Sequence, residues 1–390
     1  MTRATLVVVA LLVTPTLAHA HGRSVSYSTW TLEPSGAHVA LRLAALDVTL
    51  VGLDPFADLD ALARWASERL VVLRGGRPCP TSGAAAHTAS DGFVVVDWTM
   101  RCDGPPEAIA SRILTDVAPS HLHFARVTTP GGAVAERVLT TEEPEWTVAA
   151  AAPAGSIGSS FLDYVRLGID HIRTGYDHLA FVLALLLLSG SLAEVATIVT
   201  AFTVAHSVTL ALAVLGLVHP ATTAVEALIG FSIALVALEN AWLLGGRDRV
   251  TPWIVGAALV AMALGHPGAL DPITWLGLAL FSCCHLGLLA RSQKPAPLRT
   301  MVAFGFGLIH GFGFAGVLAN LDLPRDRLVP ALLGFNVGVE LGQLTVVTAG
   351  WIVLQSLGRA EEPARRRTAE LGSAAICGLG LFWFVTRAFG

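Results

Sequence analysis

The sequence predicts a mainly α-helical membrane protein, in which a polytopic bundle of about eight transmembrane helices follows a small β-sandwich-like periplasmic domain. Only 14% of its 390 residues are charged and 54% are hydrophobic, whereas soluble domains contain about 25% charged residues. Apolar segments of membrane-spanning length follow one another after residue 160, and short β-branched runs precede residue 150. We therefore expect a lipid bilayer around the second half, and the small net charge of −4 argues against a nucleic-acid partner.

The first 20 residues have the features of a secretory signal peptide. Arg3 precedes an apolar run over residues 6–13, and Ala18-His19-Ala20 supplies the small residues of a cleavage site. The apolar run is well short of the roughly 20 residues that a spanning helix needs, so an uncleaved first helix is the weaker interpretation. We expect cleavage after Ala20, which exports the residues that follow to the periplasm of a bacterial cell.

Residues 21–150 are expected to form one periplasmic β-rich domain. They contain β-branched and aromatic runs broken by Gly, Pro and Asp, and no apolar stretch long enough to span a membrane. Apolar residues at helical spacing predict one helix over 58–70. Strands are predicted over 24–32, 38–51, 93–100, 123–129 and 134–140.

Two pairs of side chains in this domain are candidates for chemistry. Cys79 and Cys102 lie in the exported part, where an oxidising compartment favours a disulfide over two free thiols. His121 and His123 alternate on a predicted strand and therefore share a face. We expect that face to be exposed, so the two histidines are either a two-histidine surface site or ordinary surface residues.

An Ala-, Pro-, Gly- and Ser-rich linker over 151–160 leads to a transmembrane helical domain over 161–390. Because the exported domain starts the first span outside, eight spans place the C-terminus in the periplasm. Most basic residues, Arg291 and Arg299 among them, then fall in cytoplasmic connections, as expected for an inner-membrane protein. The expected spans are 161–188, 192–218, 221–244, 252–264, 273–290, 298–319, 329–357 and 371–389.

Ionisable side chains inside these spans require a reason, because each is costly to place in a bilayer. The first span carries Asp170-His171 and Asp177-His178, and a separation of about two helical turns places the two pairs on nearly the same faces of one helix. A lone buried histidine is usually satisfied by a backbone carbonyl. The paired arrangement instead favours a ligand site.

Later spans add polar groups at a similar depth, as a single site between helices requires. Gly307 and Gly311 would let another helix approach closely beside the histidine of the sixth span, or they serve packing alone. Glu239 and Asn240, near the inner end of the third span, are either an exit step or, as we favour, a capping pair at the membrane face. The groups that share the expected depth are His206, Glu226, His310, Asn336 and Glu340, with Gln343 on the same helical face as the last two.

The types of ligand narrow the choice of metal. Imidazole and carboxylate groups without thiolates suit divalent nickel, cobalt or zinc better than copper(I). Cys283-Cys284-His285 on the fifth span is interpreted as packing, because adjacent cysteines on a helix point about 100° apart and buried cysteine behaves as a small hydrophobe.

At these motifs the membrane half resembles the HupE/UreJ family of hydrogenase and urease accessory membrane proteins. The matching segments are 168–178 with Phe181, 202–210, 225–226 with 239–240, 304–315 and 334–343. Residues 251–291 depart from the family pattern by an apparent extra helix pair. The resemblance implies metal-site or pathway roles for His171, Asp177, His178, His206, Glu226, His310 and Glu340, supported by Asp170, Asn336 and Gln343.

The function implied by the resemblance is secondary transport of a divalent transition metal from the periplasm, nickel first, with cobalt or zinc as alternatives. The hydrogenase or urease maturation machinery is the implied partner. The chief rival is an intramembrane zinc-dependent hydrolase in which Glu226 or Glu340 acts as general base. A third interpretation is a metal-responsive membrane sensor. No ATP-binding loop of the G-x-x-x-x-G-K type occurs in the sequence.

Overall fold

The structure is a computed structural model that describes residues 24–89, 92–119, 121–132, 134–148, 157–265, 268, 270–293, 295–314, 325–360 and 362–389. The expected signal peptide and residues 151–156 of the expected linker lie outside these described residues. The chain divides into two compact units, an N-terminal unit built mainly on residues 21–163 and a helical unit built on 164–319 and 332–390. Each is described by itself.

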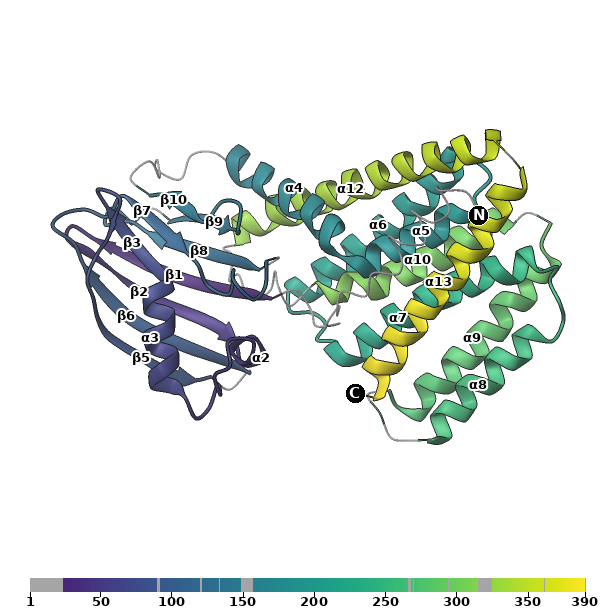
Figure 1. Cartoon of the computed structure of the whole chain (residues 1–390), viewed down its shortest axis with the longest axis horizontal. Helices are drawn as coiled ribbons and strands as arrows, with labels where there is room; N and C mark the ends of the chain where they lie inside the picture. The colour runs from purple at the N-terminus through teal and green to yellow at the C-terminus, as the bar shows by residue number, and fades with distance from the viewer. Residues whose placement is uncertain are drawn as a thin grey trace. The chain divides into compact units, whose positions relative to one another are not determined.

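Up to residue 148, the described part of the N-terminal unit contains two β-sheets and two helices (Figure 1). The larger sheet has the order β5-β6-β2-β1-β8-β9, in which β1 and β8 are parallel and all other neighbours are antiparallel. Its strands are β1 (Val25–Glu33), β2 (Gly36–Ala44), β5 (Thr81–Thr88), β6 (Phe93–Arg101), β8 (Leu122–Thr128) and β9 (Val134–Leu139). The smaller, antiparallel sheet has the order β10-β7-β3-β4. Its strands are β3 (Leu70–Arg74), β4 (Arg77–Pro78), β7 (Ala108–Ser111) and β10 (Glu145–Thr147), and the helices are α2 (Ala45–Thr49) and α3 (Leu59–Arg69).

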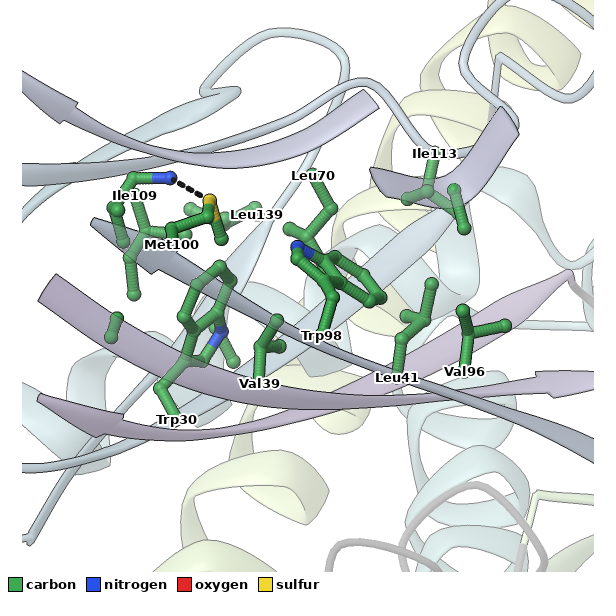
Figure 2. Packing of buried hydrophobic residues seen from close by; sticks show 14 of the residues in the cluster. Trp30, Val39, Leu41, Leu70, Val96, Trp98, Met100, Ile109, Ile113 and Leu139 are labelled. Atoms are coloured by element: carbon green, nitrogen blue, oxygen red, sulfur yellow. Dashed lines mark hydrogen bonds between the residues drawn. The ribbon is translucent and has the colours of Figure 1, made fainter. Parts of the chain in front are cut away.

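One hydrophobic core joins the two sheets. Figure 2 shows Trp30 and Trp98 of the larger sheet in one cluster with Leu70 and Ile109 of the smaller sheet. Met100 also belongs to this cluster, and its sulfur accepts a hydrogen bond from the backbone N–H of Val72 at 3.4 Å (Figure 2). The expected sandwich-like domain with one main helix is therefore confirmed.

The disulfide of this unit was predicted correctly, whereas several of its strands were not. The disulfide between Cys79 and Cys102 is present. The strand predicted over 38–51 ends at Ala44, directly before the short helix α2, and the strands β3, β4, β5, β7 and β10 were not predicted. Strand β5 is rich in Ala and largely exposed, so it lacks the alternation of apolar and polar residues on which the prediction depended.

His121 and His123 share a face as predicted, but that face is buried, so the expectation of a surface site is wrong. Both side chains are 2% exposed. They alternate with Ser24, which directly precedes β1, and with two serines of β1. The hydrogen-bonded chain runs from Asp47 through Ser24, His121, Ser26, His123 and Ser28 to Trp30. The parallel pairing of β1 with β8 brings the two sets together, since Ser26 is the register partner of His123.

All hydrogen bonds between Trp30 and Asp47 are donated in the same direction along the row of serines and histidines. The indole N–H of Trp30 can only donate and an ionised Asp47 carboxylate can only accept. Each serine therefore accepts on one side and donates on the other, and each imidazole is neutral with its proton on Nδ1. Burial and the neighbouring His121 lower the pKa of His123 from 6.5 to about 3, which agrees with a neutral ring.

The helical unit is built from the helices from residue 157 onward (Figure 1). Among the described residues, five helices are long and apolar enough to cross a membrane, namely α6, α7, α9, α12 and α13, and α5 and α8 are shorter apolar helices. A count of about eight spans is therefore not confirmed. The bounds are α4 (Ile157–Thr174), α5 (Tyr176–Leu187), α6 (Leu192–Val214), α7 (Thr222–Leu244), α8 (Thr251–Gly265), α9 (Pro272–Arg291), α10 (Pro295–Gly313), α12 (Arg325–Ala360) and α13 (Glu362–Phe389).

Small residues allow several of these helices to approach at backbone distance. A Cβ atom on Gly168 of α4 would overlap the carbonyl oxygen of Phe335 on α12, and one on Gly338 of α12 would overlap that of Val165. Likewise, a Cβ on Gly230 of α7 would lie 2.6 Å from the backbone nitrogen of Phe384 on α13. Helix pairs α4–α12 and α7–α13 are therefore packed through glycine.

Candidate metal centre

Gly175 interrupts the expected first span between its two Asp–His pairs. Its φ of −81° and ψ of 87° lie outside the helical region, and the residue separates α4 from α5. A Cβ atom here would lie 2.6 Å from the carbonyl oxygen of His171, so the bend needs a glycine. On a straight helix the pairs would be about 10 Å apart, whereas the rings of His171 and His178 have centroids 4.6 Å apart. The prediction that both pairs lie on one continuous helix is therefore wrong.

Three buried imidazoles from three helices converge beside this bend. His171 of α4, His178 of α5 and His206 of α6 each offer a ring nitrogen, and these atoms lie within 4.8 Å of one another. Three nitrogens bound to one tetrahedral ion would lie roughly 3.4 Å apart. In the structure the ring nitrogens lie up to 4.8 Å apart. To bind one ion, the distance between two of these nitrogens would thus shorten by at most about 1.4 Å.

The oxygens of two neighbouring side chains orient two of these rings. Asp177 Oδ1 lies 3.1 Å from Nδ1 of His178, and Asn336 Oδ1 lies 3.4 Å from Nδ1 of His206. The amide nitrogen of Asn336 donates to the Leu332 carbonyl at 2.8 Å, which turns the amide oxygen toward His206. If Nδ1 carries the proton in both rings, both Nε2 lone pairs are left for a ligand. Within the described residues these two Nε2 atoms are buried and have no hydrogen-bond partner.

His310 of α10 is the fourth imidazole of the cluster. Its ring centroid lies 5.2 Å from that of His178, and its Nε2 is 2.9 Å from the hydroxyl of Ser232 on α7. Gly307 and Gly311 flank it, and a Cβ on either would overlap a backbone carbonyl oxygen of α6. The predicted close approach beside His310 is therefore present, and α6 is the helix that approaches.

Aromatic rings enclose the cluster. The centroid of His171 lies 4.4 Å from that of Phe314 and 5.4 Å from that of Phe335, and the centroid of His310 lies 5.0 Å from that of Phe202. Such an apolar wall keeps water away from the imidazoles. It also strengthens their electrostatic interaction with a bound cation.

The remaining residues of the expected site lie beside other partners. On α12, Glu340 accepts from the hydroxyl of Thr200 at 2.6 Å, and the amide oxygen of Gln343 accepts from that of Thr203 at 2.9 Å. The partners of Glu226 and Asp170 are arginines. Arg387 Nε lies 4.0 Å from the Glu226 carboxylate, and Arg173 pairs with Asp170 at 2.9 Å.

Several partners of the cluster were not predicted. Thr200 and Thr203 precede His206 at intervals of three on α6, and this helical spacing could have indicated that they share its face. Ser232 and Arg387 have no comparable signal, because the sequence does not indicate which residue of another helix each of them contacts.

A second polar cluster corrects the interpretation of Glu239 and Asn240 as a capping pair. Helix α7 continues to Leu244, and both side chains are buried. Glu239 forms an ion pair with Arg299 of α10 at 2.7 Å, and its other oxygen lies 2.7 Å from His285 Nε2. Arg299, expected in a cytoplasmic connection, is instead 4% exposed within α10.

Of the two cysteines before His285, Cys283 is partly buried, as the packing interpretation expects. Cys283 donates to the Pro252 carbonyl at 3.2 Å, whereas Cys284 is exposed. The two thiols therefore do not form a joint site.

A comparison with known protein families matches the part of the chain that contains the helical unit. The family described as HupE / UreJ protein matches residues 147–267 and 266–387, which together cover more than half of the 390 residues. The two ranges meet between α8 and α9, inside the segment 251–291 that departs from the expected pattern. No curated protein matches the chain. The chain belongs to the HupE / UreJ family.

Proposed function

We propose that the chain is a secondary permease for a divalent transition metal, with nickel as the first candidate and cobalt or zinc as alternatives. The observation that carries this proposal is the convergence of ring nitrogens from His171, His178 and His206 within 4.8 Å in the helical unit. Membership of the HupE / UreJ family supports it. Three imidazoles with a carboxylate behind one of them suit a borderline divalent ion.

The chemistry of the cluster suits reversible binding. Imidazoles bind a metal only when neutral, so binding competes with protons. Asp177 supplies a negative charge beside His178, which favours a cation and holds the ring in the ligating tautomer. An ion would exchange its water for the three rings, and protonation of those rings would favour its release.

Metal uptake by whole cells tests the proposal. Radioactive nickel would be offered with cobalt or zinc as competitors to cells that express the wild type, His178→Ala or His206→Ala at equal membrane levels. His219→Ala is the matched control, because this histidine is exposed and lies between α6 and α7. We expect both cluster variants to lose uptake and the control to retain it. Normal uptake by both cluster variants would refute the proposed site.

The contacts of the carboxylates favour transport over the rival hydrolase. A zinc hydrolase needs a carboxylate that is poised to activate a water on the metal. One oxygen of Glu340 accepts from Thr200 and Glu226 lies beside Arg387, and neither carboxylate belongs to the three-histidine group of the described residues. Zinc that stays bound through purification, together with hydrolysis that depends on Glu340, would favour the hydrolase.

The proposed location is the bacterial inner membrane, with the N-terminal unit and the C-terminus in the periplasm. In this arrangement α4 and α5 together form the first span, bent at Gly175. Hydrogenase or urease maturation would then receive the imported nickel. Deletion of residues 21–150 separates this role from that of a sensor, since a permease keeps uptake by its helical unit and a sensor loses its function.

A further inference from the structure

A second buried cluster in the helical unit lies apart from the three histidines. Glu239 of α7, His285 of α9 and Arg299 of α10 are each at most 4% exposed. The Glu239 carboxylate joins the other two, since one oxygen lies 2.7 Å from Arg299 Nε and the other lies 2.7 Å from His285 Nε2. Ionisable groups buried in a membrane bundle are costly and commonly mark ion or proton pathways.

The charges in this cluster determine which ring nitrogen of His285 carries a proton and which does not. Arg299 is always charged, so the ion pair keeps Glu239 ionised and the carboxylate can only accept. His285 must then donate from Nε2–H, and its Nδ1 carries a lone pair. Within the described part of the chain, this Nδ1 is buried and has no hydrogen-bond partner. The cluster is thus neutral overall and would gain one positive charge with one proton on Nδ1.

The described neighbouring helices place two ionisable groups at His285, Glu239 directly and Arg299 through Glu239. Helix α8, which packs beside α9, contains no ionisable residue. From α7 the facing group is Glu239 and from α10 it is Arg299. On α13, Arg366 pairs with Glu370 and donates to the Leu244 carbonyl at the end of α7. A metal ion fits poorly here, because Arg299 repels it and occupies one carboxylate oxygen.

Three helices connect this cluster to the three histidines. Arg299 donates to Asn240 Oδ1 at 2.8 Å, and the Asn240 amide donates to the Ala184 carbonyl at 2.6 Å. Ala184 lies on α5, which also carries His178, and α10 carries both Arg299 and His310, separated by about three turns or roughly 16 Å. Helix α7 likewise carries Ser232, the partner of His310. A change of charge at one cluster therefore acts on helices that build the other.

We infer that His285, held by Glu239, is a proton-binding site that exchanges a proton for each metal ion handled at the histidine cluster. This inference rests on the proposed permease function. Like charges repel strongly in a low-dielectric interior, so a divalent ion at the three histidines disfavours a proton on His285. The ligand of this second site is the proton itself, bound at Nδ1.

Purified full-length protein in lipid vesicles tests this exchange with Ni²⁺ as the only added metal. One trapped dye reports nickel entry and a second reports internal pH. In the wild type we expect nickel entry to make the interior more alkaline, because protons leave. His285→Gln can still donate to Glu239 but cannot take up the proton, so the same nickel entry should make the interior less alkaline than in the wild type. Cys284→Ser is the matched control on the same helix and should behave like the wild type.

A second, double variant controls for the effect of misfolding. Glu239→Gln alone would leave the Arg299 charge buried without its partner, whereas Glu239→Gln with Arg299→Gln removes both charges together. The double variant should also show a smaller proton exit per nickel ion than the wild type. Nickel entry with unchanged proton exit in His285→Gln, or without proton exit in the wild type, would overturn the inference. Absence of nickel entry in the wild type would instead refute the permease function on which it rests.

Discussion

The buried chain of serines and histidines in the N-terminal unit makes the stability of that unit depend on pH. The pKa of His123 falls from 6.5 to about 3 on folding, chiefly through burial and then through the neighbouring His121. The unfolded chain therefore binds a proton more readily than the folded one. The contribution of His123 to the free energy of unfolding is fully present above pH 6.5 and is lost as the pH falls toward 3.

The size of the effect follows from the difference between the pKa of His123 in the unfolded chain and its pKa in the folded chain. A tenfold change in proton affinity corresponds to about 1.36 kcal/mol, so the whole window from 6.5 to about 3 is worth roughly 4 to 5 kcal/mol. At pH 4.5 the loss relative to pH 7.5 is about 2.7 kcal/mol from this group alone. That is a large part of the roughly 5–15 kcal/mol by which domains are stable.

Urea unfolding of residues 21–150 at pH 7.5 and pH 4.5 measures this contribution. The fragment is chosen because this unit is compact and has its own core. His123→Gln removes the titrating ring, so its free energy of unfolding should fall by less than that of the wild type over the same interval. His38→Gln is the control, since His38 is exposed on β2. Equal losses in wild type and His123→Gln would refute the reasoning.

Three further predictions concern the bend, the disulfide and the carboxylate behind His178. Gly175→Ala places a Cβ 2.6 Å from the His171 carbonyl, so nickel binding should weaken, whereas Gly277→Ala, with open space around its Cβ, should not change it in the same isothermal titration. Reduction of the Cys79–Cys102 bond, which closes a loop with a sequence separation of 23, should lower the free energy of unfolding by roughly 3 kcal/mol in urea titrations. Asp177→Asn keeps the shape but loses the charge behind His178, so nickel affinity should fall about 10–100-fold, and an unchanged dissociation constant would contradict its assigned role.

Much of the helical unit could be predicted because lipid imposes a simple rule. Long apolar segments must be helices there, and polar residues within them must have partners. This rule located His171, His178, His206 and His310 before any contact was known, and the structure brings these four rings together. The same reasoning placed Arg299 wrongly in a cytoplasmic connection, because a basic residue at the edge of an apolar segment resembles a loop residue. Its buried partner Glu239 is apparent only in the structure.

Other features depend on contacts between distant residues. Gly175 ends a helix only because the chain must bend between two Asp–His pairs, and a single glycine inside an apolar helix is no clear signal of a break. The alternation of His121 and His123 indicated a shared face but not its burial. That burial follows from the parallel neighbour β1, whose serines supply hydrogen bonds to both rings.

The glycine contacts indicate which parts of the histidine cluster can close around an ion. His171 lies on α4, which is packed at backbone distance against α12 through Gly168 and Gly338. His206 lies on α6, which is packed in the same way against α10. Neither helix can shift easily against its partner, so closure around the proposed ion, by at most about 1.4 Å, would bring the two pairs together as blocks. Helix α5 joins them and is connected to α4 at Gly175. A change in helix angle at this bend would therefore bring His178 to the proposed ion without disturbing either block.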